Sequence, residues 1–360
     1  MEQVKHRISS SQFFITMFVS RVVVTIALNA RYLGGENMLE AILSCGLAML
    51  LGIILALPIW GLHRAYPAET VGDISQLALG KAGKVVPLCY VLYFILINGS
   101  ALGLFHIFLL DTVNPEFSSA LTIAAVLAVA VYGAYRGIET VARCAVCVFA
   151  ILLIGSGLTF ALVAGRFDPE NLEPLFYNGW DQTLQGTALF LARTSAFADM
   201  AVLLPMVNGK KKTGFFCWAG GTFLFIGVLL LLLAGCLGPY AATQNFPVFV
   251  LSSLTEIRSM QRLDAVFVGV WMTGMIVKLA CDLYACRVCF ASLMGKRCPK
   301  TAIFLAGGVI LLLAFWAAAS PEAQKVLLDT GLLFGATVAI GSALPLLLWI
   351  VGKLRKKEKQ

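Results

Sequence analysis

The sequence predicts an all-α integral membrane protein with ten transmembrane helices. Of its 360 residues, 59% are hydrophobic and 13% are charged, whereas a soluble domain has about 25% charged residues. Long apolar runs, such as residues 223–236 and 303–319, have the composition of membrane spans. The net charge of +8 does not indicate a nucleic-acid partner, because the basic residues lie in short loops between apolar segments. We expect the apolar segments to contact the lipid bilayer, which is the predicted partner of this protein.

Individual spans follow from the rule that a helix needs about twenty apolar residues to cross a membrane. The apolar segment 246–257 is too short to span and is expected to be re-entrant or interfacial. Residues 1–11 run directly into the first apolar stretch without a small-residue cleavage site, so we expect this span to be retained. The ten predicted spans are residues 11–33, 38–61, 85–110, 118–135, 141–165, 184–206, 214–238, 263–290, 302–319 and 328–351.

The basic residues predict the orientation of these spans, because cytoplasmic loops of membrane proteins are enriched in Lys and Arg. If the N-terminus is cytoplasmic, 19 of the 27 Lys and Arg residues lie in cytoplasmic segments. Both termini are therefore predicted to be cytoplasmic, in a multi-pass membrane protein. The outer segments hold only Arg31, Arg166, Arg258, Arg262 and Lys325, and the spans hold Arg21, Arg193 and Lys278.

Ten helices divide into two sets of five that enter the membrane from opposite sides. This is the arrangement of an inverted repeat, which many secondary transporters share. We predict a single transmembrane domain over residues 1–360, with repeats at 11–165 and 184–351 and a cytoplasmic basic tail at 352–360. In such folds the first helix of each repeat is interrupted near the middle of the membrane. Helices 1 and 6 are accordingly expected to be broken.

Ionisable residues inside spans are costly, by about 2.5–3.5 kcal/mol each on insertion scales, and therefore mark candidate sites. For Arg21, Arg193 and Asp199, ligand contact and structural ion pairing are both open. Lys278 and Asp282 are four residues apart on one helix face, which favours an ion pair. We also hypothesise that Lys278 replaces a coupling cation. The candidate ligand-binding residues are Ser20, Arg21, Arg193, Thr194, Ser195 and Asp199, and the candidate ion-mimic or gating residues are Lys278 and Asp282.

The charges within the spans predict the kind of ligand. Three cations and two anions lie there, so one arginine is left without a protein counter-charge. A ligand carboxylate would satisfy it through bidentate hydrogen bonds. We therefore hypothesise a zwitterionic amino acid between helices 1 and 6, with Arg21 or Arg193 on its carboxylate. The alternative is an arginine that extends to the membrane interface or bonds backbone carbonyls.

Motifs for other classes of protein are missing from the sequence. It has no Walker A loop, no G-x-S-x-G, no H-E-x-x-H and no dinucleotide fingerprint on a suitable scaffold. We therefore expect neither an enzyme nor an ATP-driven pump, and no cofactor, catalytic residue or metal site. Two C-x-x-C pairs, Cys144/Cys147 and Cys286/Cys289, lie in apolar spans. We interpret them as apolar packing residues rather than redox or metal motifs.

Several short segments resemble, in the same order, the GerAB-like B subunits of endospore germinant receptors. They are residues 8–14 (ISSSQFF), 79–83 (LGKAG), 135–139 (YRGIE) with Arg143, 169–176 (PENLEPLF) with Gly179, Pro205, and 262–267 (RLDAVF) with Trp271 and Lys278. This resemblance implies the LeuT-like fold of the amino acid/polyamine/organocation permease superfamily. These permeases usually have glycines where helix 1 unwinds, whereas residues 17–33 here contain none. The acidic position of helix 6, often Glu in the family, is Asp199.

The resemblance also implies a function and partners. It predicts a membrane subunit of a spore germinant receptor in the cell or spore inner membrane. This subunit would bind a small nutrient, an amino acid in preference to a sugar, and signal germination together with A and C receptor subunits. The alternative is a proton- or sodium-coupled secondary amino-acid transporter. A third possibility is a structural membrane subunit without a ligand. The residues alone do not separate the first two, because a receptor can retain a transporter's binding site.

Overall fold

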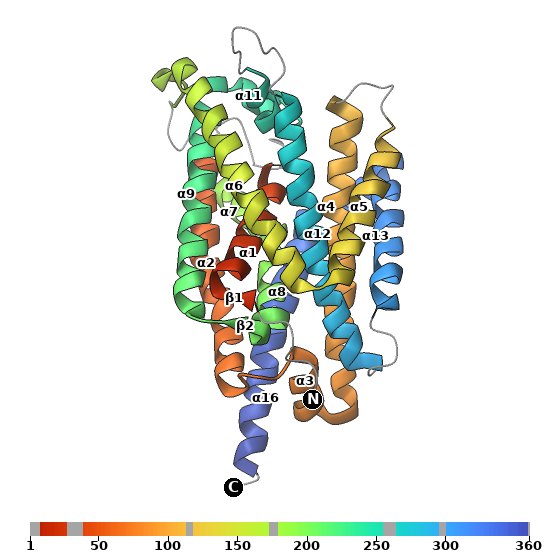
Figure 1. Cartoon of the computed structure of the whole chain (residues 1–360). Coiled ribbons are helices and arrows are strands. Elements are labelled where there is room, and N and C mark those ends of the chain that lie inside the picture. The colour runs from red at the N-terminus through yellow and green to blue at the C-terminus, as the bar shows by residue number, and fades with distance from the viewer. Residues whose placement is uncertain are drawn as a thin grey trace.

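A computed structural model describes residues 8–26, 39–112, 118–172, 179–254, 264–294 and 300–358 (Figure 1). Within these ranges the chain is almost entirely helical, because a helix satisfies its own backbone hydrogen bonds in lipid. Eight helical segments of the described chain are long and apolar enough to cross a membrane. Two further helices, α1 (Ser10–Ile26) and α12 (Asp264–Met294), run between them. The prediction of an all-α membrane fold is confirmed.

The elements of the first half follow the predicted spans. They are β1 (Ile8–Ser9), α1, α2 (Glu40–Ala65), α3 (Val71–Leu79), the 3-10 helix η2 (Gly80–Lys84), α4 (Val85–Thr112), α5 (Ser119–Arg136), α6 (Ile138–Val163), and the 3-10 helices η3 (Ala164–Arg166) and η4 (Pro169–Leu172). Helix α3 and η2 lie between the second and third predicted spans. Thr70 caps α3 by accepting a hydrogen bond from the Asp73 backbone, and the Asp73 carboxylate accepts one from Thr70.

The second half also has a helix at each predicted span. Its elements are α7 (Gly179–Ala192), α8 (Ala196–Leu203), the 3-10 helix η5 (Leu204–Met206), β2 (Val207–Asn208), α9 (Lys211–Leu237), α10 (Tyr240–Thr243), α11 (Pro247–Ser253), α12, α13 (Thr301–Ala319), α14 (Pro321–Leu327), α15 (Thr330–Val338), the π-helix η7 (Ala339–Ala343) and α16 (Leu344–Glu358). The last predicted span is therefore preceded by a short helix and continues as α16 into the basic tail.

Helix 6 is broken, as the sequence predicts. Helix α7 ends at Ala192 and α8 begins at Ala196, so three residues are not helical. Thr194 and Ser195 carry short side chains that can replace helical backbone hydrogen bonds. Thr194 Oγ1 accepts a hydrogen bond from the Ala196 amide at 3.2 Å. The Ser195 carbonyl accepts one from the Asp199 amide at 2.9 Å, which starts the new helix.

Helix 1 differs from expectation, because α1 is continuous over Ser10–Ile26 and no interruption is found there. These residues include neither glycine nor proline, the residues that most readily break a helix. Thr16 and Thr25 satisfy their hydroxyls within the helix, on the carbonyls of Gln12 and Arg21. Residues 27–33, the remainder of the predicted span, lie outside the described residues.

Short helices at opposite ends of the molecule reflect the inverted repeat. Helix α3 follows the second span of the first half, and α10 and α11 follow the second span of the second half. Figure 1 shows α3 near the bottom of the molecule and α11 at the top. Corresponding connections therefore lie on opposite sides of the helix bundle. The short α11 also agrees with the prediction that segment 246–257 does not span.

The broken helix lies at the centre of the bundle. In Gly179–Met206, 94% of the most apolar stretch is buried by the rest of the protein, against 17% in Ile138–Arg166. Helix α12 packs against α1, α4, α5, α6 and α8. The strands β1 and β2 pair in parallel, with Ile8 opposite Val207, and so join the start of α1 to the end of the broken helix. Polar residues on α8 and α12 are thereby removed from both lipid and water.

Candidate functional site

A buried ion pair lies in the middle of α12. Lys278 Nζ is 2.8 Å from Asp282 Oδ2, and both side chains are completely buried. The two residues are one helical turn apart, so the spacing that suggested an ion pair does form one. Lys278 Nζ also donates a hydrogen bond to Asn98 Oδ1 on α4 at 2.9 Å. Asn98 in turn donates to the Phe94 carbonyl at 2.7 Å, which fixes its orientation.

The same ion pair reaches the break in helix 6. Ser195 Oγ donates a hydrogen bond to Asp282 Oδ1 at 3.0 Å. Both carboxylate oxygens of Asp282 are therefore occupied, one by Lys278 and one by Ser195. This network connects α4, α12 and the start of α8 through side chains that are all buried.

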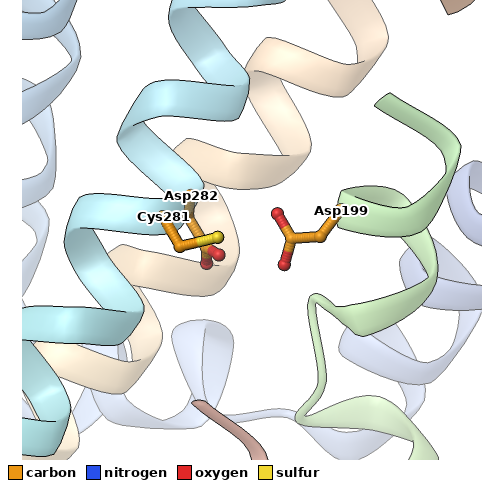
Figure 2. Close-up of side chains that lie close together, drawn as sticks. All are labelled: Asp199, Cys281 and Asp282. Atoms are coloured by element: carbon orange, nitrogen blue, oxygen red, sulfur yellow. The ribbon is translucent and has the colours of Figure 1, made fainter. Parts of the chain in front are cut away.

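Asp199 on α8 lies opposite this network (Figure 2). One of its carboxylate oxygens, the Cys281 sulfur and one Asp282 oxygen all lie within 4.8 Å of one another. Asp199 is completely buried. Among the described residues, neither of its carboxylate oxygens has a hydrogen-bond partner. Asp199, for which the sequence leaves ligand contact and ion pairing both open, thus faces a second carboxyl group.

A tyrosine and a threonine hold the break from the other side. Tyr93 on α4 donates its hydroxyl to the Thr194 carbonyl at 2.8 Å. The Tyr93 hydroxyl also lies 3.0 Å from Thr337 Oγ1 on α15. Thr337 is 3.3 Å from the Ala192 carbonyl, to which it donates a hydrogen bond. Sequence reasoning missed both residues, although a polar hydroxyl within an apolar span always needs a partner.

Arg193 and Lys278 line one small cavity at the break. Its volume is about 10 Å³, and its walls come from α1, α4, the broken helix and α12. Arg193 Nη2 also donates a hydrogen bond to the Leu328 carbonyl at 3.1 Å. Apart from the two cations, the cavity is lined by Val24, Ile97, Ser100, Ala101, Leu104 and Met275.

Arg21 lies on the other side of the broken helix. It lines a second cavity, together with Thr194, Phe197 and residues of α2 and α9. Its guanidinium carbon is 6.0 Å from the centroid of the Phe190 ring, a cation–π distance. No described residue gives Arg21 a carboxylate partner. Ser20 is buried beside it in α1 and lines neither cavity.

The candidate residues therefore fall into three groups. Ser195, Asp199, Lys278 and Asp282 come together at the centre, Arg193 lines the adjoining cavity, and Arg21 is separate. Cys281 belongs to the central group, and the only sequence signal for it is its place next to Asp282. No described cysteine forms a disulfide, including both C-x-x-C pairs.

The helical architecture and the buried charged centre define a multi-pass membrane protein with a transporter-like fold. The fold is similar to that of a Na⁺-coupled sialic acid symporter in a substrate-bound outward-open state, with a TM-score of 0.66 and 12% sequence identity. The similarity covers 95% of this chain and 89% of that chain. A family model described as "Spore germination protein" matches residues 7–323, and the chain belongs to this family.

Individual relatives agree with the family assignment. Spore germination protein KB of Bacillus subtilis (strain 168) is 25% identical over 86% of this chain and 85% of its own length. Spore germination protein YndE of the same organism is 22% identical over 89% of this chain and 88% of its own length. The resemblance to germinant-receptor B subunits that the short motifs suggested is confirmed.

Proposed function

We propose that this chain is the membrane subunit of a spore germinant receptor that binds an amino acid and signals germination. The observation that carries the proposal is the cavity between α1, α4, the broken helix and α12, which Arg193 and Lys278 line together. Family membership supports a role in germination, and the transporter-like fold supports a small ligand. Neither role includes catalysis, and the proposal needs no cofactor.

The lining of this cavity suits an aliphatic amino acid. A guanidinium binds a carboxylate through two parallel hydrogen bonds, so Arg193 is proposed to hold the ligand carboxylate. Val24, Leu104 and Met275 offer apolar contacts for the side chain. Asp199, or a backbone carbonyl at the break, is proposed to face the amino group. Arg21 is the alternative anchor, in the second cavity.

Ligand binding here requires movement of the walls. A volume of about 10 Å³ is at the limit for one water molecule. An amino acid therefore binds a more open arrangement, and it shifts the protein toward that arrangement by its preferential affinity. Displacement of α7 and α8 relative to α12 is the proposed signal. A and C receptor subunits in the inner membrane are its proposed recipients, with both termini of this chain cytoplasmic.

A proton- or sodium-coupled secondary amino-acid transporter is the second candidate, and the symporter-like fold favours it. The two functions differ in whether the ligand crosses the membrane. Reconstituted vesicles that accumulate a labelled amino acid would favour transport. Saturable binding without accumulation would favour a receptor. No binding of any nutrient that triggers germination would favour a structural subunit without a ligand.

Two arginine variants test the proposed site. Arg193→Gln and Arg21→Gln are compared with Arg143→Gln, whose arginine is exposed and paired with Glu139 on the surface of α6. The germination response to an amino acid and to its amide analogue is measured in each. If Arg193→Gln no longer discriminates against the amide, the cavity lined by Arg193 is supported as the ligand site. The same result in Arg21→Gln would instead assign the ligand to the second cavity. Wild-type sensitivity in both variants, at normal expression, rejects a carboxylate site at either arginine.

A further inference from the structure

We propose that Asp199 and Asp282 form a buried proton-binding site, in which one proton is held between the two carboxyl groups and links α8 to α12. When Asp199 holds the proton, a backbone carbonyl at the break, the other candidate named above, is left to face the nutrient's amino group. The proton site adjoins the cavity proposed for the nutrient, and neither aspartate lines that cavity. Its test does not require the nutrient, so it can fail while the proposed function stands.

The first argument is the balance of charge around the two carboxyl groups. Asp282 has its negative charge compensated by Lys278 at 2.8 Å, and its second oxygen accepts from Ser195. The carboxylate oxygens of Asp199 have no hydrogen-bond partner among the described residues, although the residue is completely buried. A buried, uncompensated carboxylate is strongly unfavourable. Something must neutralise Asp199, and its carboxylate points toward Asp282 and Cys281 (Figure 2).

The second argument is that the surrounding charged groups are engaged elsewhere. His63 on α2 lies 3.1 Å from the Ala201 carbonyl, and Tyr93 on α4 donates to the Thr194 carbonyl. Arg21 on α1 faces the Phe190 ring, and Lys211 donates to the Leu204 carbonyl. The π-helix η7, which also packs against α8, has no titratable residue. The titratable groups that interact electrostatically with Asp199 are Tyr93 on α4 and Lys278, Cys281, Asp282, Cys286 and Cys289 on α12. Among the described residues, none of these groups donates a hydrogen bond to the Asp199 carboxylate.

A proton fits the site better than a metal ion. The cluster has two carboxyl groups and one thiol, and both oxygens of Asp282 already bond Lys278 and Ser195, whereas hard cations take six or more oxygen ligands. The Lys278 ammonium group, 2.8 Å from Asp282, would also repel a second cation. A proton needs no further ligand. It stays covalently bound to one carboxyl oxygen, and that hydroxyl donates a hydrogen bond to an oxygen of the other aspartate.

Occupancy of this site controls the contact between two helices. With one proton, the two carboxyl groups attract each other through a hydrogen bond. After the proton leaves, two negative charges face each other in a region of low dielectric constant and repel. Because Ser195 bonds to Asp282, this repulsion acts on the start of α8 at the helix break. Proton binding is thereby coupled to the position of the broken helix.

Infrared spectroscopy of the full-length protein in lipid nanodiscs tests the site, because a protonated carboxyl group has a C=O stretching band separate from that of a carboxylate. Spectra at neutral pH are compared for the wild type, Asp199→Asn and the exposed control Glu170→Gln. We expect a protonated-carboxyl band in the wild type, its loss or shift in Asp199→Asn, and no change in the control. A wild-type spectrum without the band, or an unchanged band in Asp199→Asn, overturns the proposal.

A second measurement covers the case in which Asp199→Asn does not fold. The wild-type band is recorded with sodium or zinc chloride, and with choline chloride in their place. Independence from the metal ion supports a proton, whereas a band that disappears when sodium or zinc is added identifies a metal site and overturns the proposal. In addition, Ser195→Ala removes a hydrogen bond from Asp282 without removing a carboxyl group. It should shift the band, and an unshifted band argues against a proton shared with Asp282.

Discussion

Ser195 donates a hydrogen bond from its Oγ to Asp282 Oδ1 at 3.0 Å, and this contact ties the break of helix 6 to the middle of α12. The break is held on its other side by Tyr93, which donates to the Thr194 carbonyl. The non-helical residues therefore have specific partners on two neighbouring helices. A change at either contact should alter the stability of the break before it alters the rest of the bundle.

Replacement of Ser195 by Ala is the most direct test of this connection. It removes one buried hydrogen bond between helices, and such bonds contribute about 1 kcal/mol to stability. We expect a free energy of unfolding lower by about that amount, measured by denaturant unfolding in a mild detergent. Thr159→Ala is the matched control, because within the described residues Thr159 Oγ1 bonds the Gly155 carbonyl of its own helix and no other helix. Equal losses in both variants would contradict a special role for Ser195.

The ion pair on α12 predicts that substitutions of Lys278 and Asp282 have non-additive effects on stability. Asp282→Asn leaves the buried Lys278 ammonium group without a counter-charge, and breaking a buried pair in this way costs about 3–5 kcal/mol. Lys278→Gln combined with Asp282→Asn removes both charges and should recover part of that loss. The free energies of unfolding of the two single variants and the double variant measure the coupling. Strictly additive losses would show that the two side chains do not interact.

The close packing of α4 on α13 gives a third prediction. A Cβ atom added at Gly103 would lie 2.8 Å from the Ala317 Cβ atom, so the two helices would have to move apart. Gly103→Ala should lower the melting temperature, with a cost of about 1–3 kcal/mol for overpacking. Gly157→Ala on α6 is the control, because no atom lies within 4 Å of the added Cβ there. A Gly103→Ala protein as stable as the control would be inconsistent with this packing.

The fold was predictable to a large extent because its determinants are local. Apolar runs of about twenty residues identified the spans, and the analogy with inverted-repeat transporters predicted the break in helix 6. The break in helix 1 was expected from the analogy with other permeases, yet α1 is continuous over Ser10–Ile26. The absence of glycine from this stretch was the better guide. Helix α3 was missed because its nine residues are too short for a criterion based on spans.

The candidate site was less predictable because it depends on contacts between distant segments. Spacing of four residues sufficed to pair Lys278 with Asp282. It contained no information on whether Asp199 would meet an arginine or another aspartate, and charge counting favoured the arginine. The structure brings Asp199 to Asp282 and Cys281 instead. Tyr93 and Thr337 were missed because a single hydroxyl in an apolar helix does not identify its partner.

The orientation in the membrane gives a fourth prediction, which rests on the distribution of Lys and Arg. Glu170 and Lys212 are both exposed and are predicted to lie on opposite sides. A membrane-impermeant maleimide added to intact cells should label Glu170→Cys, and should label Lys212→Cys only after permeabilisation. The background must lack the exposed native cysteines Cys144, Cys147 and Cys217. Cys298, which lies outside the described residues, is replaced as well. Labelling of both positions in intact cells would rule out the ten-span topology.

The last prediction concerns Lys278 and sodium. Lys278 carries a fixed positive charge in the middle of the bundle, hydrogen-bonded to Asn98 and paired with Asp282. We hypothesise that this ammonium group takes the place of the cation that a sodium-coupled relative would bind. Like a bound sodium ion, it supplies one positive charge that neutralises the Asp282 carboxylate. The response to the amino acid, whether germination or uptake, should therefore persist when sodium is replaced by choline. Lys210→Gln, at an exposed lysine outside the bundle, should behave like the wild type. A strict sodium requirement with Lys278 intact would show that the lysine does not replace an ion.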